Sequence, residues 1–510
     1  MFVTAPCFER HVVGGTYRHN WATVIQRRLW LTIHLPHAII PAASDNGDDS
    51  RRSQETKELR QPDFVILGGG IAGLTFALEA TRRGKRVVVL ESEDQVGGLA
   101  RTLIFGDYRF DIGGHRYHSR WPEITNWVLD VMNGDMLDVP RRSRIRLDRR
   151  YVNYPLQFPS ALTALSLPEA ARVLISYLKA SLWRNSGHQD VSFEDWVVRR
   201  FGRTLHDIYF RPYTEKVWGM DCNELSADWA SQRIKLPSLA AAVKGSLLRG
   251  TSPPGTLVSR FLYPPLGIGM IPERLAEKAL ATGWADIRLS SRAFRLESGD
   301  TANGWRVHYR QAGQEKTVCG LQVVSTIPLG SLLQMLPLAD ETAAALNSTL
   351  TYRGLICVFL AIDGSCVSDD TWTYFPDPQL TFGRTHEPPN WSSRMAPAGK
   401  TSLCAEVFCT QGDDVWQRPD GELIDAVTKD LDHLGFLVRG RVRDAWVLRV
   451  PDAYPVYRVG YADTVRRVRN TLARWPTLHL LGRTGSFQYL NMDGVIKQAL
   501  ELADVLIETT

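Results

Sequence analysis

Glycines near residue 70 have a spacing that lets a polypeptide backbone approach a phosphate group closely. The segment Gly68-Gly-Gly70-Ile-Ala-Gly73 follows the apolar run 64–67 and precedes a stretch with helical spacing at 74–83. Gly68 permits a tight turn, Gly70 admits a pyrophosphate to the backbone, and Gly73 allows helix and strand to pack closely. The unpaired N–H groups at the start of such a helix attract anions. The spacing therefore predicts a phosphate-binding turn between a strand and a helix.

An acidic residue ends the second strand that this arrangement requires. The apolar run 86–90 is followed by Glu91, whose carboxylate can accept hydrogen bonds from both ribose hydroxyls of an adenosine. Strand, glycine turn, helix, strand and acid come in the order of a Rossmann βαβ unit, so the sequence predicts a dinucleotide site. Further strands are expected at 285–289, 305–309 and 321–327, and 478–483 is expected to be a strand that ends in glycine.

Composition restricts the other classes of function. The chain has 510 residues, 44% of them hydrophobic, and a net charge of +5, which gives no reason to expect a nucleic acid partner. Its seven cysteines show no C-x-x-C pair or zinc spacing, which favours reduced thiols, a cytoplasmic location and no bound metal. The apolar stretch 29–40 is too short and too interrupted to span a membrane. Residues 1–61 are expected to be a disordered or mis-called N-terminal extension without a part in the chemistry.

Two more glycine-rich segments follow the acid, Val96-Gly97-Gly98-Leu99 and Gly113-Gly114-His115. Together with the βαβ unit they resemble the extended signature of the glutathione-reductase-type FAD family, particularly its amine-oxidase and mutase branches. The resemblance implies FAD as the cofactor and a last helix whose N-terminus points at the flavin pyrimidine. Residues 491–507 are the candidate for that helix, whose positive end would stabilise anionic reduced flavin.

The region from Arg120 to about Leu248 is predicted to be helical. Two of its segments, 166–169 and 192–195, have the residue types of capped helix starts, and the first has a proline where its missing N–H does no harm.

An aromatic segment follows, Tyr209-Phe210-Arg-Pro-Tyr213-Thr-Glu-Lys-Val-Trp218-Gly219. It resembles the Y-T-x-K-x-W segment of the UDP-galactopyranose mutase family. The resemblance implies that Tyr213 stacks on the nucleotide base and that Trp218 forms a wall of the sugar site, with Phe210 also near the substrate. The residues themselves leave open the alternative that this cluster is helical core.

Other blocks resemble the same family in the same order. Asp111 to His118 resembles its glycine–histidine segment, which implies that His115 and His118 line the flavin face. Residues 382–385 resemble the segment that gives one arginine to the diphosphate, here Arg384. Residues 452–455 resemble its P-Y-Y-P segment, which implies that Tyr454 reaches a phosphate.

The block 482–493 resembles the G-R-L-x-x-Y-x-Y-Y-D-M end of the family. It implies that Arg483 lies near the flavin, Tyr489 on the diphosphate and Asn491 beside the sugar. The family also uses a second arginine on a mobile lid, which corresponds to 219–240. The lid cation is assigned to Arg233, since a guanidinium forks onto a pyrophosphate, with Lys235 as the alternative.

Two positions depart from the family pattern. Asn491 stands where the bacterial enzymes have an aspartate, which removes a negative charge near the sugar. Arg116 adds a positive charge beside the histidine pair. Both departures put galactose as the sugar, and UDP as the sole carrier, in doubt.

The resemblance implies a pyranose–furanose mutase that isomerises a nucleotide-diphosphate sugar, UDP-galactopyranose or a related UDP- or TDP-hexose, through an adduct between the sugar and N5 of reduced FAD. The alternative is an FAD-dependent oxidoreductase of the amine-oxidase, protoporphyrinogen-oxidase or desaturase type, which shares both terminal motifs. NAD(P)H stays open as the reductant and a homodimer as the assembly. No nucleic acid or membrane partner is expected.

The predicted fold class is α/β, a glutathione-reductase-like Rossmann FAD-binding domain with an inserted helical domain and an antiparallel β-sheet domain. The FAD domain is expected at 62–120, 262–345 and 446–510, the helical substrate domain at 121–261, and the sheet substrate domain at 346–445. The residues assigned to FAD are Gly68, Gly70, Ile71, Ala72, Gly73, Glu91, Ser92, Gly98, Leu99, Gly114, His115, Gly482, Arg483, Asn491 and Met492. Those assigned to catalysis are Arg384, Arg233, Tyr489, Tyr454, His115 and Arg483, and those assigned to the substrate are Tyr213, Trp218, Phe210, Asn491, Lys235 and His118.

Overall fold

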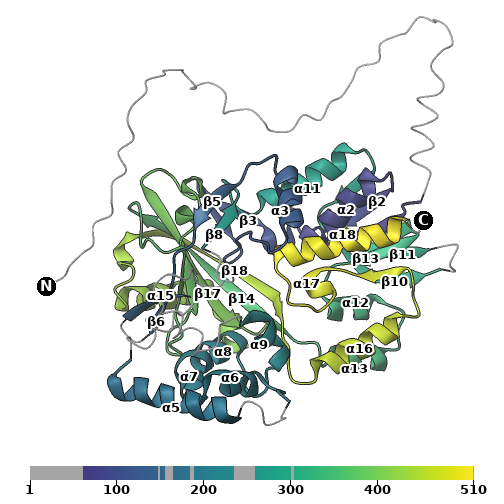
Figure 1. Ribbon diagram of the computed structural model, residues 1–510. Helices are drawn as coiled ribbons and strands as arrows, with labels where there is room; N and C mark the ends of the chain where they lie inside the picture. Colours follow the sequence, from purple (N-terminus) through teal and green to yellow (C-terminus); the bar gives the residue numbers. More distant parts are fainter. Residues whose placement is uncertain are drawn as a thin grey trace, which may run out of the picture. The chain divides into compact units, whose positions relative to one another are not determined.

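The computed structural model describes residues 61–147, 150–154, 165–183, 189–234, 259–299 and 304–508 (Figure 1). Apart from Gln61, the predicted N-terminal extension lies outside these residues. None of the described helices is long and apolar enough to cross a membrane. The six cysteines that the structure describes are free thiols.

A five-stranded parallel sheet contains the predicted dinucleotide unit. Its strand order is β19-β13-β1-β2-β9, so non-consecutive parts of the chain meet in one layer (Figure 1). The strands are β1 (Phe64–Leu67), β2 (Val87–Leu90), β9 (Ala285–Arg288), β13 (Gln322–Ser325) and β19 (Leu478–Leu480). The strands expected around 287, 307, 324 and 479 are confirmed, the second of them in a separate sheet.

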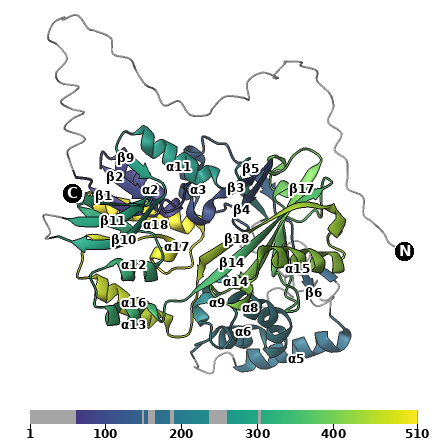
Figure 2. The ribbon, with the colours of Figure 1, turned by 180° about the vertical axis from the view of Figure 1, so that it is seen from behind.

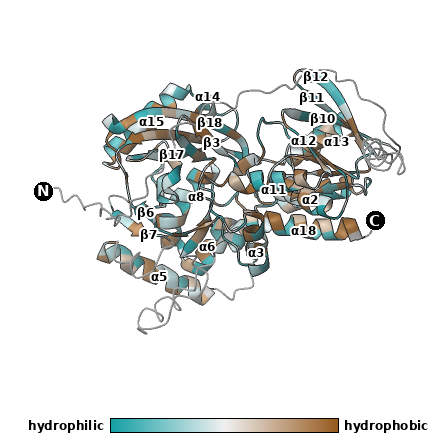
Figure 3. Cartoon of the chain, turned by 90° about the horizontal axis from the view of Figure 1, so that it is seen from above, coloured by the Kyte–Doolittle hydropathy of each residue, from teal (hydrophilic) through white to brown (hydrophobic). Residues whose placement is uncertain are grey.

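Three helices cover this sheet, α2 (Ile71–Arg82), α11 (Met270–Ala281) and α18 (Met492–Glu508). Helix α2 begins directly after Gly70, three residues earlier than expected, because Gly70 is already extended and its carbonyl accepts a hydrogen bond from the Leu74 N–H at 3.0 Å. The predicted closing helix is confirmed as α18. Figure 3 shows brown apolar segments along α18, which includes the buried core residues Val495 and Ile496.

A seven-stranded sheet forms the second layer, in the order β18-β14-β17-β16-β15-β6-β7 (Figure 2). Only the β15–β6 pair in it is parallel. The strands are β6 (Ser143–Leu147), β7 (Arg150–Asn153), β14 (Tyr352–Asp363), β15 (Trp372–Tyr374), β16 (Arg384–His386), β17 (Lys400–Cys409) and β18 (Val442–Pro455). Helix α15 (Asp420–His433) packs against β14 and β18. Strand β18 continues across the boundary predicted at residue 446.

The helical prediction from Arg120 onward is wrong for residues 137–147 and 150–153. After α3 (Pro122–Val131) the chain forms β5 (Leu137–Pro140) and then β6 and β7. The pattern of β6 shows the reason, because Ser143 and Ile145 are buried while Arg144 between them is not, which is the two-residue period of a strand.

Helices dominate the described residues 165–183 and 189–234, and both predicted starts are confirmed. Helix α5 (Leu167–Trp183) begins after Ser166, whose N–H donates to Glu169 at 2.9 Å. Helix α6 (Phe193–Phe201) has a full capping box, in which Ser192 and Asp195 exchange hydrogen bonds of 3.1 and 2.9 Å. The helices that follow are α7 (Arg203–Leu205), a π-helical turn η2 (His206–Phe210), α8 (Arg211–Trp218) and α9 (Ala227–Arg233).

The remaining elements connect these layers. The strands are β3 (Thr102–Phe105) paired with β4 (Tyr108–Asp111), β8 (Arg260–Tyr263) paired with β5, and the three-stranded sheet of β10 (Ser291–Ser298), β11 (Trp305–Gln311) and β12 (Gln314–Gly320). The helices are α12 (Leu329–Met335), α13 (Asp340–Asn347), α14 (Asp414–Gln417), α16 (Tyr461–Leu472) and α17 (Gly482–Gly485), with the 3₁₀ turns η1 (Gly98–Ala100), η3 (Pro388–Asn390), η4 (Ser393–Met395) and η5 (Arg439–Arg441).

Candidate active site

The first glycine motif forms a cradle that side chains would fill. A Cβ at Gly73 would lie 2.2 Å from the carbonyl oxygen of Gly68, so only glycine allows this helix to approach the strand. Gly68 has φ +101°, which side-chain-bearing residues rarely adopt. From the far end of the chain, a Cβ at Gly482 would lie 2.8 Å from Ala72. The turn after β1 is therefore enclosed by residues more than 400 positions away.

The second glycine pair docks on this cradle. The Gly97 N–H donates to the Gly69 carbonyl at 2.8 Å, and a Cβ at Gly98 would meet the Gly70 Cα at 3.4 Å. The structure thus brings together the two glycine motifs that the sequence singled out, with Leu99 next to them in η1.

Glu91 is buried at the end of β2 with its carboxylate turned toward the cradle. One oxygen accepts from the Gly69 N–H at 2.7 Å, and the other accepts from the Glu93 N–H at 2.9 Å. The Ser92 hydroxyl reaches the second oxygen at 3.3 Å. A carboxylate has about four acceptor positions, so acceptor capacity remains for the hydroxyls of a ribose.

The first prediction concerns this carboxylate. Glu91→Ala should weaken FAD binding about 100-fold, because two hydrogen bonds to a charged group are lost. The flavin content after gel filtration and titration of the apoprotein with FAD measure the effect. Glu93→Gln is the matched control, since Glu93 is exposed and pairs with Arg101 at 2.9 Å. Undiminished flavin in the Glu91 variant would contradict the ribose assignment.

The glycine–histidine segment lies against the second sheet. A Cβ at Gly114 would be 2.4 Å from the Trp372 ring, so glycine is needed for this contact. Burial, and next the charge of Arg483, lower the pKa of His115 to about 4, and its Nδ1 has no hydrogen-bond partner among the described residues. His115 is therefore neutral near pH 7 and can exchange a hydrogen bond with a bound group.

Arg384 and Glu406 form a buried ion pair beside that segment. Arg384 Nη2 donates to Glu406 and, at 2.7 Å, to the Tyr454 hydroxyl. Burial by itself would raise the pKa of Glu406, but the Arg384 charge, the nearby His386 ring and the hydrogen bond from Arg384 lower it to about 2. The other Glu406 oxygen accepts from the Gly114 N–H at 3.2 Å. One carboxylate therefore connects the arginine to the glycine–histidine segment.

The Arg483 guanidinium lies over the rings of two tyrosines, Tyr489 and Tyr454. Its Cζ is 4.2 Å from the ring centre of Tyr489 and 4.8 Å from that of Tyr454. Its Nη1 donates weakly to the Leu490 carbonyl at 3.4 Å. Its buried Nε and Nη2 have no hydrogen-bond partner within the described part of the chain, and the same holds for Nε of Arg384. The cluster therefore presents several buried cationic donors that a ligand could satisfy.

The aromatic segment contributes two rings to this cluster. The Tyr213 ring lies 5.4 Å from that of Tyr374. Burial raises the pKa of the Tyr213 hydroxyl, although the charge of Arg384 acts in the opposite direction. The Trp218 ring is 6.3 Å from Tyr454 and 6.1 Å from Tyr489. Trp218 also belongs to the buried helical core, so it contacts the cluster from within that core, and its role beside a sugar stays a prediction.

Other predicted site residues lie apart from the cluster or outside the description. Phe210 stacks on Phe201 in the helical core at 5.6 Å. Asn491 is exposed and directly precedes α18 and its first residue, Met492. Burial lowers the pKa of His118, and the charge of Asp493 on α18 acts against this shift. The side chain of Arg233 and the whole of Lys235 lie outside the described residues.

Sequence reasoning missed several residues of the cluster. Glu406 left a signal, because it is the one charged residue in the otherwise uncharged run 401–409, and a charge inside a buried strand needs a partner. Trp372, Tyr374 and His386 left no comparable signal, since their neighbourhood depends on strand pairing between distant segments.

These residues fit a flavin dinucleotide. The cradle excludes side chains where a pyrophosphate would pass, Glu91 has acceptor capacity for a ribose, and the unpaired His115 Nδ1 lies beside the cluster. A family model agrees, since residues 71–507 match that of the flavin containing amine oxidoreductases. The chain therefore belongs to this family, and FAD is the cofactor that the family implies.

Its relatives include more than one kind of enzyme. The chloroplastic protoporphyrinogen oxidase of Nicotiana tabacum is 23% identical over 79% of this chain and 78% of that protein. A probable UDP-galactopyranose mutase of Klebsiella pneumoniae is 24% identical over 33% of this chain and 44% of that protein.

Solved structures confirm the predicted fold class. Reduced UDP-galactopyranose mutase superposes with a TM-score of 0.77 at 22% identity, covering 88% of this chain and 96% of that one. A putative protoporphyrinogen oxidase from Exiguobacterium gives a TM-score of 0.69 at 21% identity, covering 88% and 99%.

Proposed function

We propose that this protein is a pyranose–furanose mutase that isomerises a nucleotide-diphosphate sugar, UDP-galactopyranose or a related UDP- or TDP-hexose. One observation carries the proposal, which is the group of buried guanidinium donors of Arg384 and Arg483 without a hydrogen-bond partner among the described residues. A diphosphate supplies the oxyanions that such donors bind best.

FAD in its reduced form would supply the nucleophile for the anomeric carbon of the sugar. The chain's own residues would hold the leaving diphosphate, whose negative charge grows as its bond to the sugar breaks. Arg384 and Arg483 stabilise that charge from fixed positions, an effect that is strong in a water-poor site. A further positive charge on the diphosphate would come from the predicted lid, from Arg233 or alternatively from Lys235.

Tyr454 would assist as a neutral donor. Burial raises the pKa of its hydroxyl, so the proton stays in place at neutral pH. Its oxygen already accepts from Arg384 at 2.7 Å, which leaves its O–H to donate to a phosphate oxygen. Tyr213 would stack on the base and Trp218 would limit the space for the sugar.

The experiment compares reduced and oxidised enzyme. Protein reduced with dithionite, and in a parallel arm with NADH or NADPH, is incubated without oxygen with UDP- and TDP-hexoses. We expect furanose products only from reduced enzyme, identified by chromatography and proton NMR. Turnover by oxidised enzyme alone, with oxygen consumed, would favour an oxidase and overturn the proposal. Similarity to protoporphyrinogen oxidase over most of the chain makes that outcome the main competitor.

A further inference from the structure

A second pair of arginines lies outside the Arg384–Arg483 cluster. Arg116 Cζ is 5.5 Å from the ring centre of Trp372 and 5.9 Å from that of Phe261. Across the residues that the structure describes, Arg116 has no hydrogen bond and no ion pair. Among those described residues, only the faces of Trp372 and Phe261 contact its charge.

Arg141 is the other member of the pair. Its Nε donates to the Ser143 hydroxyl at 3.1 Å, and its Cζ lies 5.8 Å from the Tyr154 ring centre. No carboxylate within the described ranges pairs with it. Tyr374 joins the two arginines, because its ring is 4.6 Å from Tyr154 and 6.0 Å from Trp372.

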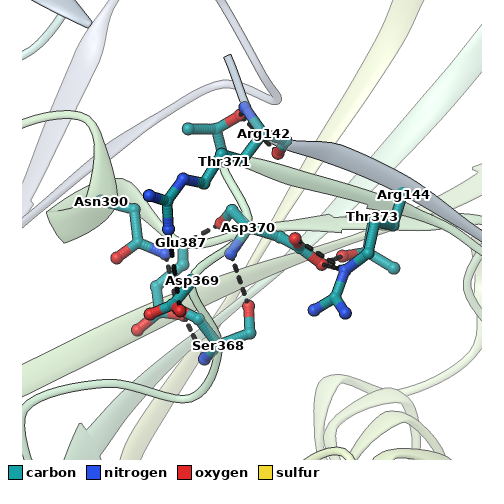
Figure 4. A network of polar contacts seen from close by, with 9 residues as sticks. All are labelled: Arg142, Arg144, Ser368, Asp369, Asp370, Thr371, Thr373, Glu387 and Asn390. Atoms are coloured by element: carbon teal, nitrogen blue, oxygen red, sulfur yellow. Dashed lines mark hydrogen bonds and ion pairs between the residues drawn. The ribbon is translucent and has the colours of Figure 1, made fainter. Parts of the chain in front are cut away.

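Two arginines close in sequence to Arg141, Arg142 and Arg144, have carboxylate partners, as Figure 4 shows. Arg144 Nε binds both oxygens of Asp370 at 2.8 and 2.7 Å, and Arg142 lies 3.7 Å from Asp369. Arg116 and Arg141 have no such carboxylate partner among the described residues. Segments 155–164 and 235–258, which lie outside the described residues, contain no aspartate or glutamate in the sequence.

The electrostatics of Arg116 are unfavourable without a ligand. Burial, and next the charge of Arg141, lower its pKa to about 10, and the charge of Arg384 acts in the same direction. The half-buried Arg116 guanidinium remains protonated near neutral pH, so its charge loses part of its solvation without gaining a counter-ion among the described residues. An oxyanion between Arg116 and Arg141 would offset that loss.

We propose that Arg116 and Arg141 form a second anion subsite, which binds a carboxylate or phosphate that the substrate carries besides the anion at Arg384 and Arg483. The subsite would add to the substrate recognition of the proposed mutase. It rests on the proposed function in one respect, which is that the anion at Arg384 and Arg483 is a diphosphate. The Tyr374 ring also contacts Tyr213, so the subsite adjoins the ring that would stack on the base. The extra oxyanion belongs either to a sugar acid or to a phosphate monoester on the ribose.

Inorganic phosphate tests the subsite without any assumption about nucleotides. Oxidised holoenzyme is titrated by calorimetry, and we expect the Arg116→Gln/Arg141→Gln double variant to lose one phosphate site that the parent has. Arg142→Gln, which removes the same charge one residue away, should keep it. Unchanged stoichiometry and affinity in the double variant would overturn the proposal. If that variant fails to fold, Arg141→Gln alone, at a half-buried position, carries the test.

Two matched ligand pairs identify the source of the anion. UDP-glucuronate is compared with UDP-glucose, and uridine 3′,5′-bisphosphate with uridine 5′-monophosphate. We expect the ligand with the extra anion in one pair to bind about tenfold more tightly, as a charged hydrogen bond provides, and Arg116→Gln to abolish that preference. If the two ligands of each pair bind equally tightly, the proposal that the substrate carries a second anion is overturned.

The two proposals fail separately. Absence of furanose formation with every nucleotide sugar, while the phosphate site persists and depends on Arg116 and Arg141, would overturn the mutase and leave the subsite. Furanose formation with no phosphate site at these arginines would overturn the subsite and leave the mutase.

Discussion

Arg384→Ala is expected to lower turnover by a factor of about 1,000, the loss typical for one fixed donor to a developing oxyanion, while the purified protein keeps its yellow colour. The guanidinium contacts Glu406 and Tyr454, and its buried Nε has no hydrogen-bond partner among the described residues. The side chain lies on β16, outside the glycine cradle on the first sheet. Flavin binding should therefore survive its removal.

Steady-state rates with the best sugar from the panel measure this effect. Arg384→Lys separates charge from geometry, because a lysine keeps the charge but cannot bind Glu406, Tyr454 and a phosphate with one planar group. We expect it to recover a small part of the lost rate. Arg142→Gln is the surface control. Undiminished turnover in Arg384→Ala would remove the residue from the diphosphate role.

Glu406→Gln is expected to lower the free energy of unfolding by about 3–5 kcal/mol, because it leaves the Arg384 charge buried without its partner. The Glu406 side chain is completely buried on β17. Urea denaturation measures the loss. In the Arg384→Ala/Glu406→Gln double variant the loss should be smaller than the sum of the single losses, since neither charge is then left alone. Additive losses would show that the pair is not coupled.

The same pair gives the stability a particular pH dependence. The pKa of Glu406 is about 2 in the folded protein, against an ordinary value of 4.5. A lowered carboxylate pKa stabilises the fold above pH 4.5, and this stabilisation is lost as the pH falls from 4.5 toward 2. The acid slope of the parent in this window should be absent from Glu406→Gln. An identical slope in both would show that other carboxylates cause it.

The parts that the sequence predicted share one property, which is that their signals are local. Gly68, Gly73 and Glu91 lie within 24 residues of one another, and the order of their types is sufficient to define the turn, the helix and the second strand. The capping box at Ser192 spans four residues and was predicted for the same reason.

The contacts of Arg384 with Glu406 and Tyr454, which the sequence did not predict, depend on pairing between distant strands. The three side chains come from three strands, Arg384 from β16, Glu406 from β17 and Tyr454 from β18. Arg384 and Glu406 lie opposite each other because β16 pairs with β17, whereas β14 lies between β17 and β18. Strand β14 is buried on both faces along nearly its whole length, so no alternation of apolar and polar residues indicates which residues lie opposite each other. The partners of Arg384 could not be derived from such a pattern.

The order of the strands in the first sheet has a consequence for biosynthesis. Strand β19 and helix α18 are the last regular elements of the described chain, and both pack on the layer that β1 and α2 begin. A nascent chain on the ribosome therefore exposes an incomplete cradle until residues near 500 have emerged from the exit tunnel. Pairing over such a separation is slow and leaves apolar surface uncovered in the meantime. The cradle that β1 and α2 begin is consequently complete only after nearly the whole described chain has been synthesised.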